Sequence, residues 1–252
     1  MKIAVYGNQC QDHKVEEIRA LFEALRASGA FIEVERGFLE YVKGLIPDVV
    51  ADKAVGDGEV SADVVVSIGG DGTFLRAAAW VGSRETPIFG VNTGHLGYLS
   101  DVSVADVSTF VAGLADGNFR IERRSLLQVD TNAGVALANR YALNEVAILK
   151  NASASMLAMD TSVDTTMLNT YLGDGLIIAT PTGSTAYNLS VGGPILHPAC
   201  SSFVLSPIAA HSLTMRPLVV PDTVEIAVTT RSERSHTFRI SVDGESLSLP
   251  IG

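Results

Sequence analysis

Residues 64–73 read VVVSIGGDGT, a β-branched run that ends in a turn of glycines around one aspartate. The run shows no polar alternation, which is typical of a strand buried on both faces. The glycines lead into residues 73–81, which have a helix-like composition, and a further apolar run follows at 88–91. Strands that alternate with helices in this way predict an open parallel α/β domain.

The chain upstream of this stretch repeats the pattern. Apolar runs at 3–6 and 31–34 predict two more strands, and residues 15–27 between them place apolar side chains at helical spacing. Gly29 is a plausible end for that helix. Residues 43–60 are rich in Gly, Asp and Pro, so a loop-containing connection is expected there.

The pattern changes near residue 119, where period-two alternation begins. Apolar and polar residues alternate over 224–229 and 238–243, and residues 135–149 and 155–163 are also strand-like. These segments predict an antiparallel β domain, with one helical interruption at 185–191. We therefore expect an α/β domain over residues 1–118 and a β domain over residues 119–252.

The composition limits the possible functions. A net charge of -10 disfavours a nucleic-acid-binding surface, which needs clustered cations. Two cysteines, Cys10 and Cys200, are too few for a disulfide scaffold and show no zinc pattern, so reduced thiols in a cytoplasmic protein are expected. No apolar run is long enough to span a membrane.

Asp71 is the unusual feature of the glycine turn. Glycines between a strand and a helix let the backbone approach an anion, and free N–H groups at the helix start favour phosphate. A carboxylate beside phosphates can hold Mg²⁺ or take a proton from an attacking hydroxyl, and both roles belong to phosphoryl transfer. Arg76 could reach a phosphate. The alternative is a tight turn with Asp71 as the helix N-cap and Arg76 as an ordinary exposed arginine.

Residues 174–190 form a second motif, in which a strand leads into the hydroxyl-rich sequence TPTGSTAY at 180–187. Hydroxyls and backbone N–H groups suit ribose and phosphate oxygens, and Tyr187 could stack on a base. The alternative is a capping segment with a core tyrosine. Ser184 lacks the Gly-x-Ser-x-Gly elbow of a hydrolase.

Three shorter signals remain. Asn144 and Glu145 precede an apolar strand and would need polar partners there, from a ribose or adenine or from a neighbouring loop. Residues 92–97 form a second glycine-containing loop, expected at the same sheet edge as the first. Residues 243–245, Asp-Gly-Glu, are most simply a hairpin turn, and the alternative is that they reach the site. The five histidines show no ligand spacing.

Together these motifs resemble the bacterial NAD kinases. They are GGDGTFL at 69–75, NTGHLG at 92–97, Asn144-Glu145, and Asp174-Gly175-Leu176 followed by TPTGSTAY at 180–187. They fall in the family's order and cover about residues 1–250. The GGDG element also occurs in lipid kinases and, loosely, in phosphofructokinases, whereas TPTGSTAY is far more specific.

The resemblance implies a Rossmann-like first domain, a β-sandwich second domain and a site between them. It implies Asp71 as proton acceptor, Asn144 and Glu145 at the adenosine and ribose, and Asp174 at the other end of the dinucleotide. The full set of expected nucleotide-binding residues is Gly72, Phe74, Leu75, Arg76, Asn92, Asn144, Glu145, Asp174, Thr182, Thr185, Ala186, Tyr187, Asn188, Leu189, Ser190 and Glu245.

The resemblance also implies ATP as donor, a divalent cation such as Mg²⁺ held mainly by donor phosphates, and a homodimer or homotetramer. The chain departs from some members at Leu172 and Ser155, where those have a basic residue and a histidine, and members usually extend beyond the position of Gly252. Two alternatives stay open: a lipid or sugar kinase of the GGDG type, and a non-catalytic NADP(H)-binding regulator.

Overall fold

The computed structural model describes residues 1–252 except 94–96, 101, 104–105 and 152–155. The chain divides into two compact units, Met1–Glu122 and Arg123–Gly252. The boundary expected between residues 118 and 119 falls in the segment that follows the last helix of the first unit. The two units are described separately below.

The first unit is built on a six-stranded sheet in the order β3-β2-β1-β4-β5-β6, and every neighbouring pair is parallel. Because the order reverses between β1 and β4, the carboxyl ends of these strands mark the usual ligand edge of an open α/β sheet. The strands are β1 (Lys2–Gly7), β2 (Phe31–Glu35), β3 (Lys53–Val55), β4 (Val64–Ile68), β5 (Ile88–Asn92) and β6 (Val102–Ser103); the helices are α1 (Val15–Ala27), α2 (Arg36–Leu45), α3 (Asp71–Val81) and α4 (Val107–Ala115).

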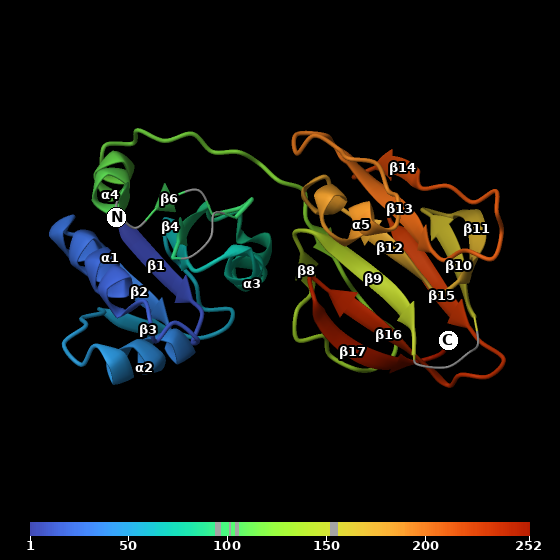
Figure 1. The fold of residues 1–252 in the computed structure, drawn as a ribbon, viewed down its shortest axis with the longest axis horizontal. Coiled ribbons are helices and arrows are strands. Elements are labelled where there is room, and N and C mark those ends of the chain that lie inside the picture. Colours follow the sequence, from blue (N-terminus) through green and yellow to red (C-terminus); the bar gives the residue numbers. More distant parts are fainter. Residues whose placement is uncertain (94–96, 101, 104–105, 152–155) are drawn as a thin grey trace. The chain divides into compact units, whose positions relative to one another are not determined.

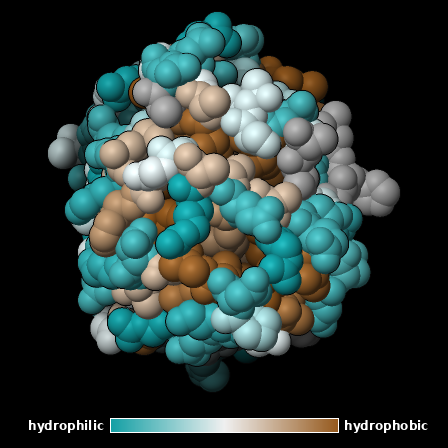
Figure 2. All heavy atoms as spheres, turned by 90° about the vertical axis from the view of Figure 1, so that its left-hand side faces the viewer, coloured by the Kyte–Doolittle hydropathy of each residue, from teal (hydrophilic) through white to brown (hydrophobic). Residues whose placement is uncertain are grey.

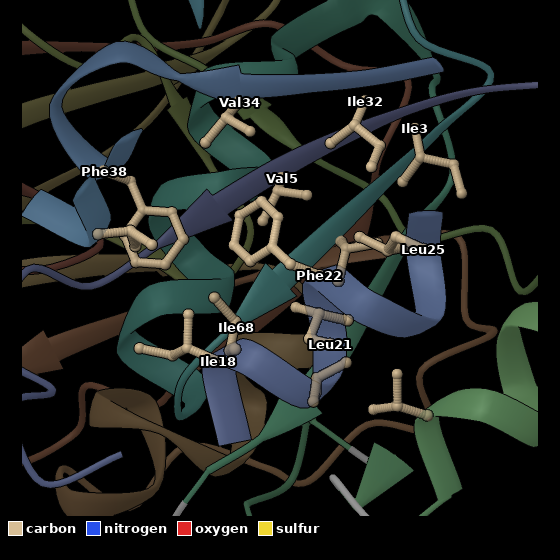
Figure 3. Close-up of a cluster of buried hydrophobic side chains, with 14 of the residues drawn as sticks. Ile3, Val5, Ile18, Leu21, Phe22, Leu25, Ile32, Val34, Phe38 and Ile68 are labelled. Carbon is tan, nitrogen blue, oxygen red and sulfur yellow. The ribbon is translucent and has the colours of Figure 1, made fainter. Parts of the chain in front are cut away.

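Aliphatic side chains on both faces of this sheet form its core. On one face Val5, Val66 and their neighbours pack against α1, α2 and α4 (Figure 3). On the other, Ala4 and Val65 pack against Trp80 of α3. All five residues of β4 are buried, which agrees with the uninterrupted apolar run that predicted this strand.

Of the strands β1 to β6 and the helices α1 to α4, four were not predicted: α2, β3, β6 and α4. The helix over 15–27 and its end at Gly29, whose φ is 70°, are confirmed. The stretch expected as a loop-containing connection, however, includes the end of α2 and the strand β3. Helix α2 begins behind Glu35, whose carboxylate accepts hydrogen bonds from Gly37 N (2.8 Å) and Phe38 N (2.7 Å). Glutamate is not among the preferred N-cap residues, so the start of this helix has a weak sequence signal.

The second unit contains a six-stranded antiparallel sheet in the order β14-β13-β12-β9-β16-β17, a three-stranded sheet in the order β11-β10-β15 and the pair β7-β8 (Figure 1). Side chains of the two larger sheets share one core, which confirms the strand-rich second domain. The strands are β7 (Leu127–Gln128), β8 (Tyr141–Ala142), β9 (Glu145–Lys150), β10 (Leu157–Val163), β11 (Thr166–Gly173), β12 (Gly175–Ala179), β13 (Ser202–Ile208), β14 (Leu218–Pro221), β15 (Ile226–Arg231), β16 (Thr237–Val242) and β17 (Glu245–Pro250).

Two sequence expectations for this unit were too broad. The strand expected over 135–149 is interrupted, since only β8 and β9 are regular there. The helix expected over 185–191 is a single turn, α5 (Tyr187–Ser190), preceded by a 3₁₀ turn at Thr182–Thr185. Ala186 between them has φ −94° and ψ −128°, which no helix continues.

The surface agrees with the composition. In the view of Figure 2, which faces the first unit, hydrophilic residues cover most of the surface and smaller apolar areas lie between them. Cys10 and Cys200 are both exposed and free. Among the described residues, no helix is both long and apolar enough to span a membrane.

Candidate functional site

The first candidate region is the Asp71 turn, which we define as residues 69–73 together with 97–99. Gly69 has φ 149° and lies so close to Thr73 that an added Cβ would be 2.4 Å from Thr73 Oγ1. Gly70 is the N-cap of α3, and Asp71 is its first residue. The alternative in which Asp71 is the N-cap is therefore wrong.

The Asp71 carboxylate contacts a second loop instead. It accepts hydrogen bonds from Tyr98 N at 2.8 Å and Leu99 N at 3.0 Å. A Cβ at Gly97 would lie 2.2 Å from Asp71 Oδ1, so this position has room only for glycine while the carboxylate stays in place. The two glycine loops thus meet at one sheet edge, as predicted. Residues 94–96 of the expected motif lie outside the described residues.

The other predicted residues of the first unit surround this turn. Gly72 and Arg76 are exposed, Phe74 and Leu75 are half-buried, and Asn92 is buried at the end of β5. Burial raises the pKa of Tyr6, and the nearby Arg76 guanidinium partly opposes that rise. Arg76 therefore lies beside the β1 phenol at the first turns of α3.

The second region is the Glu145 corner, which we define as residues 143–145, 180–183 and Asp243. Asp243 belongs to the turn between β16 and β17, so the predicted hairpin is confirmed. Its carboxylate accepts hydrogen bonds from the backbone N–H groups of Leu143 (2.7 Å), Asn144 (2.9 Å) and Glu145 (2.9 Å). The turn residue Asp243, whose contacts the sequence did not predict, thus holds the whole Asn144-Glu145 segment.

Glu145 itself is incompletely satisfied. Its Oε2 is buried and has no hydrogen-bond partner among the described residues. Burial, and after it the nearby Asp243 carboxylate, raises the pKa of Glu145 to about 7, while the Tyr187 N–H opposes the rise. A buried carboxyl oxygen without a partner is suited to accept a hydrogen bond from a ligand hydroxyl.

The hydroxyl-rich segment at 180–187 packs directly on residues 143 and 144. Thr180 Oγ1 donates to Leu143 O at 2.5 Å and accepts from Gly183 N at 3.2 Å. A Cβ at Gly183 would lie 2.1 Å from the carbonyl oxygen of Asn144. Thr182 is buried, and its Oγ1 accepts a hydrogen bond from Arg124 Nη1 at 3.2 Å. Arg124 was not predicted, because only a contact distant in sequence places it here.

The residues that follow differ in exposure. Thr185, Tyr187, Leu189 and Ser190 are exposed, and Ala186 is half-buried. Asn188 is fully buried; its amide donates to Ser184 O (3.0 Å) and Pro194 O (3.1 Å) and accepts from Ser206 Oγ (2.6 Å). Asn188 thus fixes the shape of the segment that exposes Tyr187, and its own nucleotide contact stays a prediction.

Asp174 and Glu245 take part in none of the hydrogen bonds described above. Asp174 precedes β12 and pairs with Lys150 (Nζ–Oδ1 2.6 Å). In the register of β9 with β12, Ala179 is opposite Glu145 and Gly175 is opposite Leu149, so Asp174 is at the other end of the strand from the Glu145 corner. Glu245 is exposed at the start of β17. The described residues hold no group of three or more His, Cys, Asp or Glu that could form a metal site.

Comparisons with known proteins bear on these regions. Residues 48–119 match the model of the ATP-NAD kinase N-terminal domain, and residues 143–249 match that of the C-terminal domain. An NAD kinase from Bacteroides fragilis is 45% identical over 98% of this chain and 85% of its own length. One from Porphyromonas gingivalis is 44% identical over 99% of this chain and 86% of its own length.

Two solved structures are also similar. An NAD kinase from Archaeoglobus fulgidus in complex with ATP is 28% identical with a TM-score of 0.69, covering 100% of this chain and 92% of that chain. Yeast NADH kinase complexed with NADH is 22% identical with a TM-score of 0.85, covering 100% and 76%, and supports the fold.

These findings define a two-domain kinase, a phosphotransferase with an alcohol group as acceptor. The Asp71 turn belongs to its first matched domain and the Glu145 corner to its second. The chain is a member of the NAD kinase family, which confirms the resemblance seen in the motifs. The alternatives of a lipid or sugar kinase and of a non-catalytic NADP(H)-binding regulator are not favoured.

Proposed function

We propose that this enzyme transfers the γ-phosphoryl group of ATP to the 2′-hydroxyl of the adenosine ribose of NAD, which yields NADP. The family and the ATP complex of the Archaeoglobus relative support the donor and acceptor. The observation that carries the proposal within this chain is the buried Oε2 of Glu145 beside Asn144, which has no hydrogen-bond partner among the residues that the structure describes. A ribose diol offers the hydroxyl donors that such an oxygen needs.

Asp71 is the proton acceptor in this proposal. Its carboxylate is half-buried and held by two backbone N–H groups, so its position is defined while part of it remains accessible. Accepting the 2′-hydroxyl proton would make the ribose oxygen a better nucleophile as the phosphoryl group arrives. A base within hydrogen-bond reach contributes about 10²–10⁴-fold to rate.

The second unit supplies the contacts to the adenosine and ribose in this proposal. Asn144 and Glu145 contact the adenosine and ribose, and Tyr187, which is 41% exposed, packs on a ring. The remaining contacts are assigned to Gly72, Phe74, Leu75, Arg76, Asn92, Asp174, Thr182, Thr185, Ala186, Asn188, Leu189, Ser190 and Glu245.

Magnesium is proposed as the divalent cation. The described residues offer no cage of three ligating side chains. This fits Mg²⁺, which commonly binds through one or two carboxylates and substrate phosphates rather than an all-protein site. When bound with the donor it would neutralise phosphate charge. We further propose a homodimer or homotetramer and, from the two free exposed cysteines, a cytoplasmic location.

A coupled assay tests the reaction. Purified protein with NAD and MgATP should form NADP, and omission of Mg²⁺ should abolish turnover. Substituting NADH and polyphosphate measures acceptor and donor preference. NADP(H) binding without any ATP-dependent product would instead indicate a regulator. Light scattering after size-exclusion chromatography gives the oligomeric state, and a monomer at assay concentration would contradict that part of the proposal.

A further inference from the structure

Gln11 lies in the loop after β1 and is only 4% exposed. Its side-chain amide bonds to three segments of the ligand edge. Nε2 donates to Asn8 O at 2.9 Å and to Ile68 O at 3.1 Å, while Oε1 accepts from Thr93 Oγ1 at 2.8 Å. One buried side chain thus connects the ends of β1, β4 and β5.

The hydrogen bonds of Gln11 to Ile68 and to Thr93 both involve segments that hold the Asp71 turn. Ile68 is the last residue of β4 and precedes Asp71 by only the two glycines. Thr93 directly follows β5, the strand whose Val91 O accepts a hydrogen bond from Gly69 N at 2.9 Å. Because two glycines give the backbone unusual freedom, the position of Asp71 depends on contacts that hold the turn from outside.

The Gln11 backbone is also fixed. Its N–H donates to Tyr41 Oη at 2.6 Å, and that hydroxyl donates to Asp12 Oδ1 at 2.7 Å. Tyr41 belongs to α2, whose apolar face packs in the core of the sheet. The Gln11 backbone is therefore bonded to a helix that packs in the core of the unit, rather than to another loop.

We propose that Gln11 is a positioning residue for phosphoryl transfer, which acts by holding the Asp71 turn in register with β1 and β5. This inference rests on the proposed role of Asp71. Among the described residues, the Gln11 side chain bonds to Asn8, Ile68 and Thr93, none of which we place in contact with NAD. Its removal should therefore lower kcat about 10–100-fold and leave the KM for NAD within about twofold, as expected when a group is misplaced rather than lost.

A double-mutant cycle tests the proposal. We expect Gln11→Ala to lower kcat in the wild-type background but to change the residual rate of Asp71→Asn by less than about threefold, because residues that act as a unit are not additive. An equal loss in both backgrounds would overturn the proposal. The single variant Asp71→Asn tests the proposed role of Asp71 as base. If this variant kept its turnover, that role would be wrong whatever the result for Gln11.

A second measurement does not depend on activity. Hydrogen exchange at the Tyr98 and Leu99 amides, which bond to Asp71, should become at least about tenfold faster in Gln11→Ala. Thr93→Val should act in the same direction, and Thr93→Ser, which keeps the hydroxyl, should restore wild-type exchange and kcat. Leu25→Ala, a buried change in α1, serves as a control for general destabilisation. Unchanged exchange in Gln11→Ala, or equal acceleration in Leu25→Ala, would overturn the proposal.

Discussion

The Asp71 turn and the Glu145 corner are both held by a carboxylate that bonds to the backbone of a distant segment. Asp71 accepts hydrogen bonds from two backbone N–H groups, and Asp243 accepts hydrogen bonds from three. In each, a glycine lets the segments meet, Gly97 against Asp71 and Gly183 against Asn144.

The two carboxylates differ in what remains free. Asp71 is bound by a loop and stays half-exposed, whereas Asp243 is bound at the start of a sheet strand, and burial raises its pKa although three N–H groups oppose the rise. The carboxyl group of the corner with remaining capacity is instead that of its neighbour Glu145, whose Oε2 has no hydrogen-bond partner in the part of the chain that the structure describes. A carboxylate saturated with backbone donors supports structure, and one with remaining capacity is available to a ligand.

Replacing Asp71 should produce the largest effect. Asp71→Asn keeps the shape of the side chain but removes the base, so kcat should fall about 10²–10⁴-fold. Binding of NAD, measured by calorimetry, should change little because in our proposal Asp71 accepts a proton and is not among the residues that bind the dinucleotide. Turnover within about threefold of wild type would remove Asp71 from the role of base.

Replacing Asp243 should mainly affect stability. Asp243 has φ 45°, which glycine tolerates, so Asp243→Gly removes three hydrogen bonds without adding backbone strain. We expect unfolding of the second unit to become easier by about 3 kcal/mol, with a raised KM for NAD.

Asp164→Gly is the matched control. Asp164 also has a positive φ, at 53°, and accepts a single exposed hydrogen bond, from Glu225 N at 3.0 Å. Its loss should cost about 1 kcal/mol or less. Equal losses for the two variants in thermal or denaturant unfolding would show that the three buried bonds of Asp243 have no special weight.

A methyl group at Gly97 should show that catalysis depends on the position of the Asp71 carboxylate separately from the stability of the fold. Gly97→Ala pushes the Asp71 carboxylate aside, since the new Cβ would lie 2.2 Å from Oδ1. We expect kcat to fall about 10–100-fold with a small change in melting temperature. Gly44→Ala in α2, where an added Cβ meets no atom within 4 Å, should leave kcat unchanged. An active Gly97→Ala enzyme would mean that the two glycine loops need not stay together.

The smallest effect concerns pH and belongs to the corner. The pKa of Glu145 is raised from 4.5 to about 7, so the carboxyl loses its proton as pH rises through neutrality. Ribose hydroxyls donate better to the ionised form, so the KM for NAD should fall by up to about tenfold between pH 6 and 8. Glu145→Gln should flatten this dependence, and an unchanged profile in that variant would assign it to another group.

The same pKa shift of Glu145 also makes the stability of the fold depend on pH. Stability should fall as pH rises, whereas NAD binding should improve. Because the native state keeps the Glu145 proton at pH values where the unfolded chain has lost it, this group lowers the free energy of unfolding as pH rises from about 4.5 to 7. Denaturant titrations of Glu145→Gln across this range should lack that component.

The sequence predicted regular and local features well. The helix over 15–27 and the strand over 64–68 follow from side-chain periodicity, and the hairpin at 243–245 follows from Asp-Gly chemistry. The motifs also identified the family. The helix expected over 185–191 was too long. The regular part is a single turn, and the residue before it, Ala186, has a non-helical backbone that side-chain periodicity cannot reveal over so few positions.

Other features depend on distant contacts and could not be predicted. Gln11 looks like an ordinary loop residue, and only the strand order brings it to Ile68 and Thr93. Asp243 was read as part of a turn, and its bonds to 143–145 depend on the pairing of β16 with β9. Polar clamps of this kind leave no periodic signal, since each partner is a backbone group that every residue type carries.

The separation of Asp243 from its partners has a consequence for synthesis of the enzyme. Its bonds to Leu143, Asn144 and Glu145 span 98 to 100 positions of the chain. As the ribosome releases the polypeptide from its N-terminus, the parallel sheet with Asp71 is complete early, while Asn144 and Glu145 wait for the last hairpin. In our proposal, a nascent chain thus acquires its proton acceptor, Asp71, before the pair that binds the ribose, and a truncated chain would carry the first without the second.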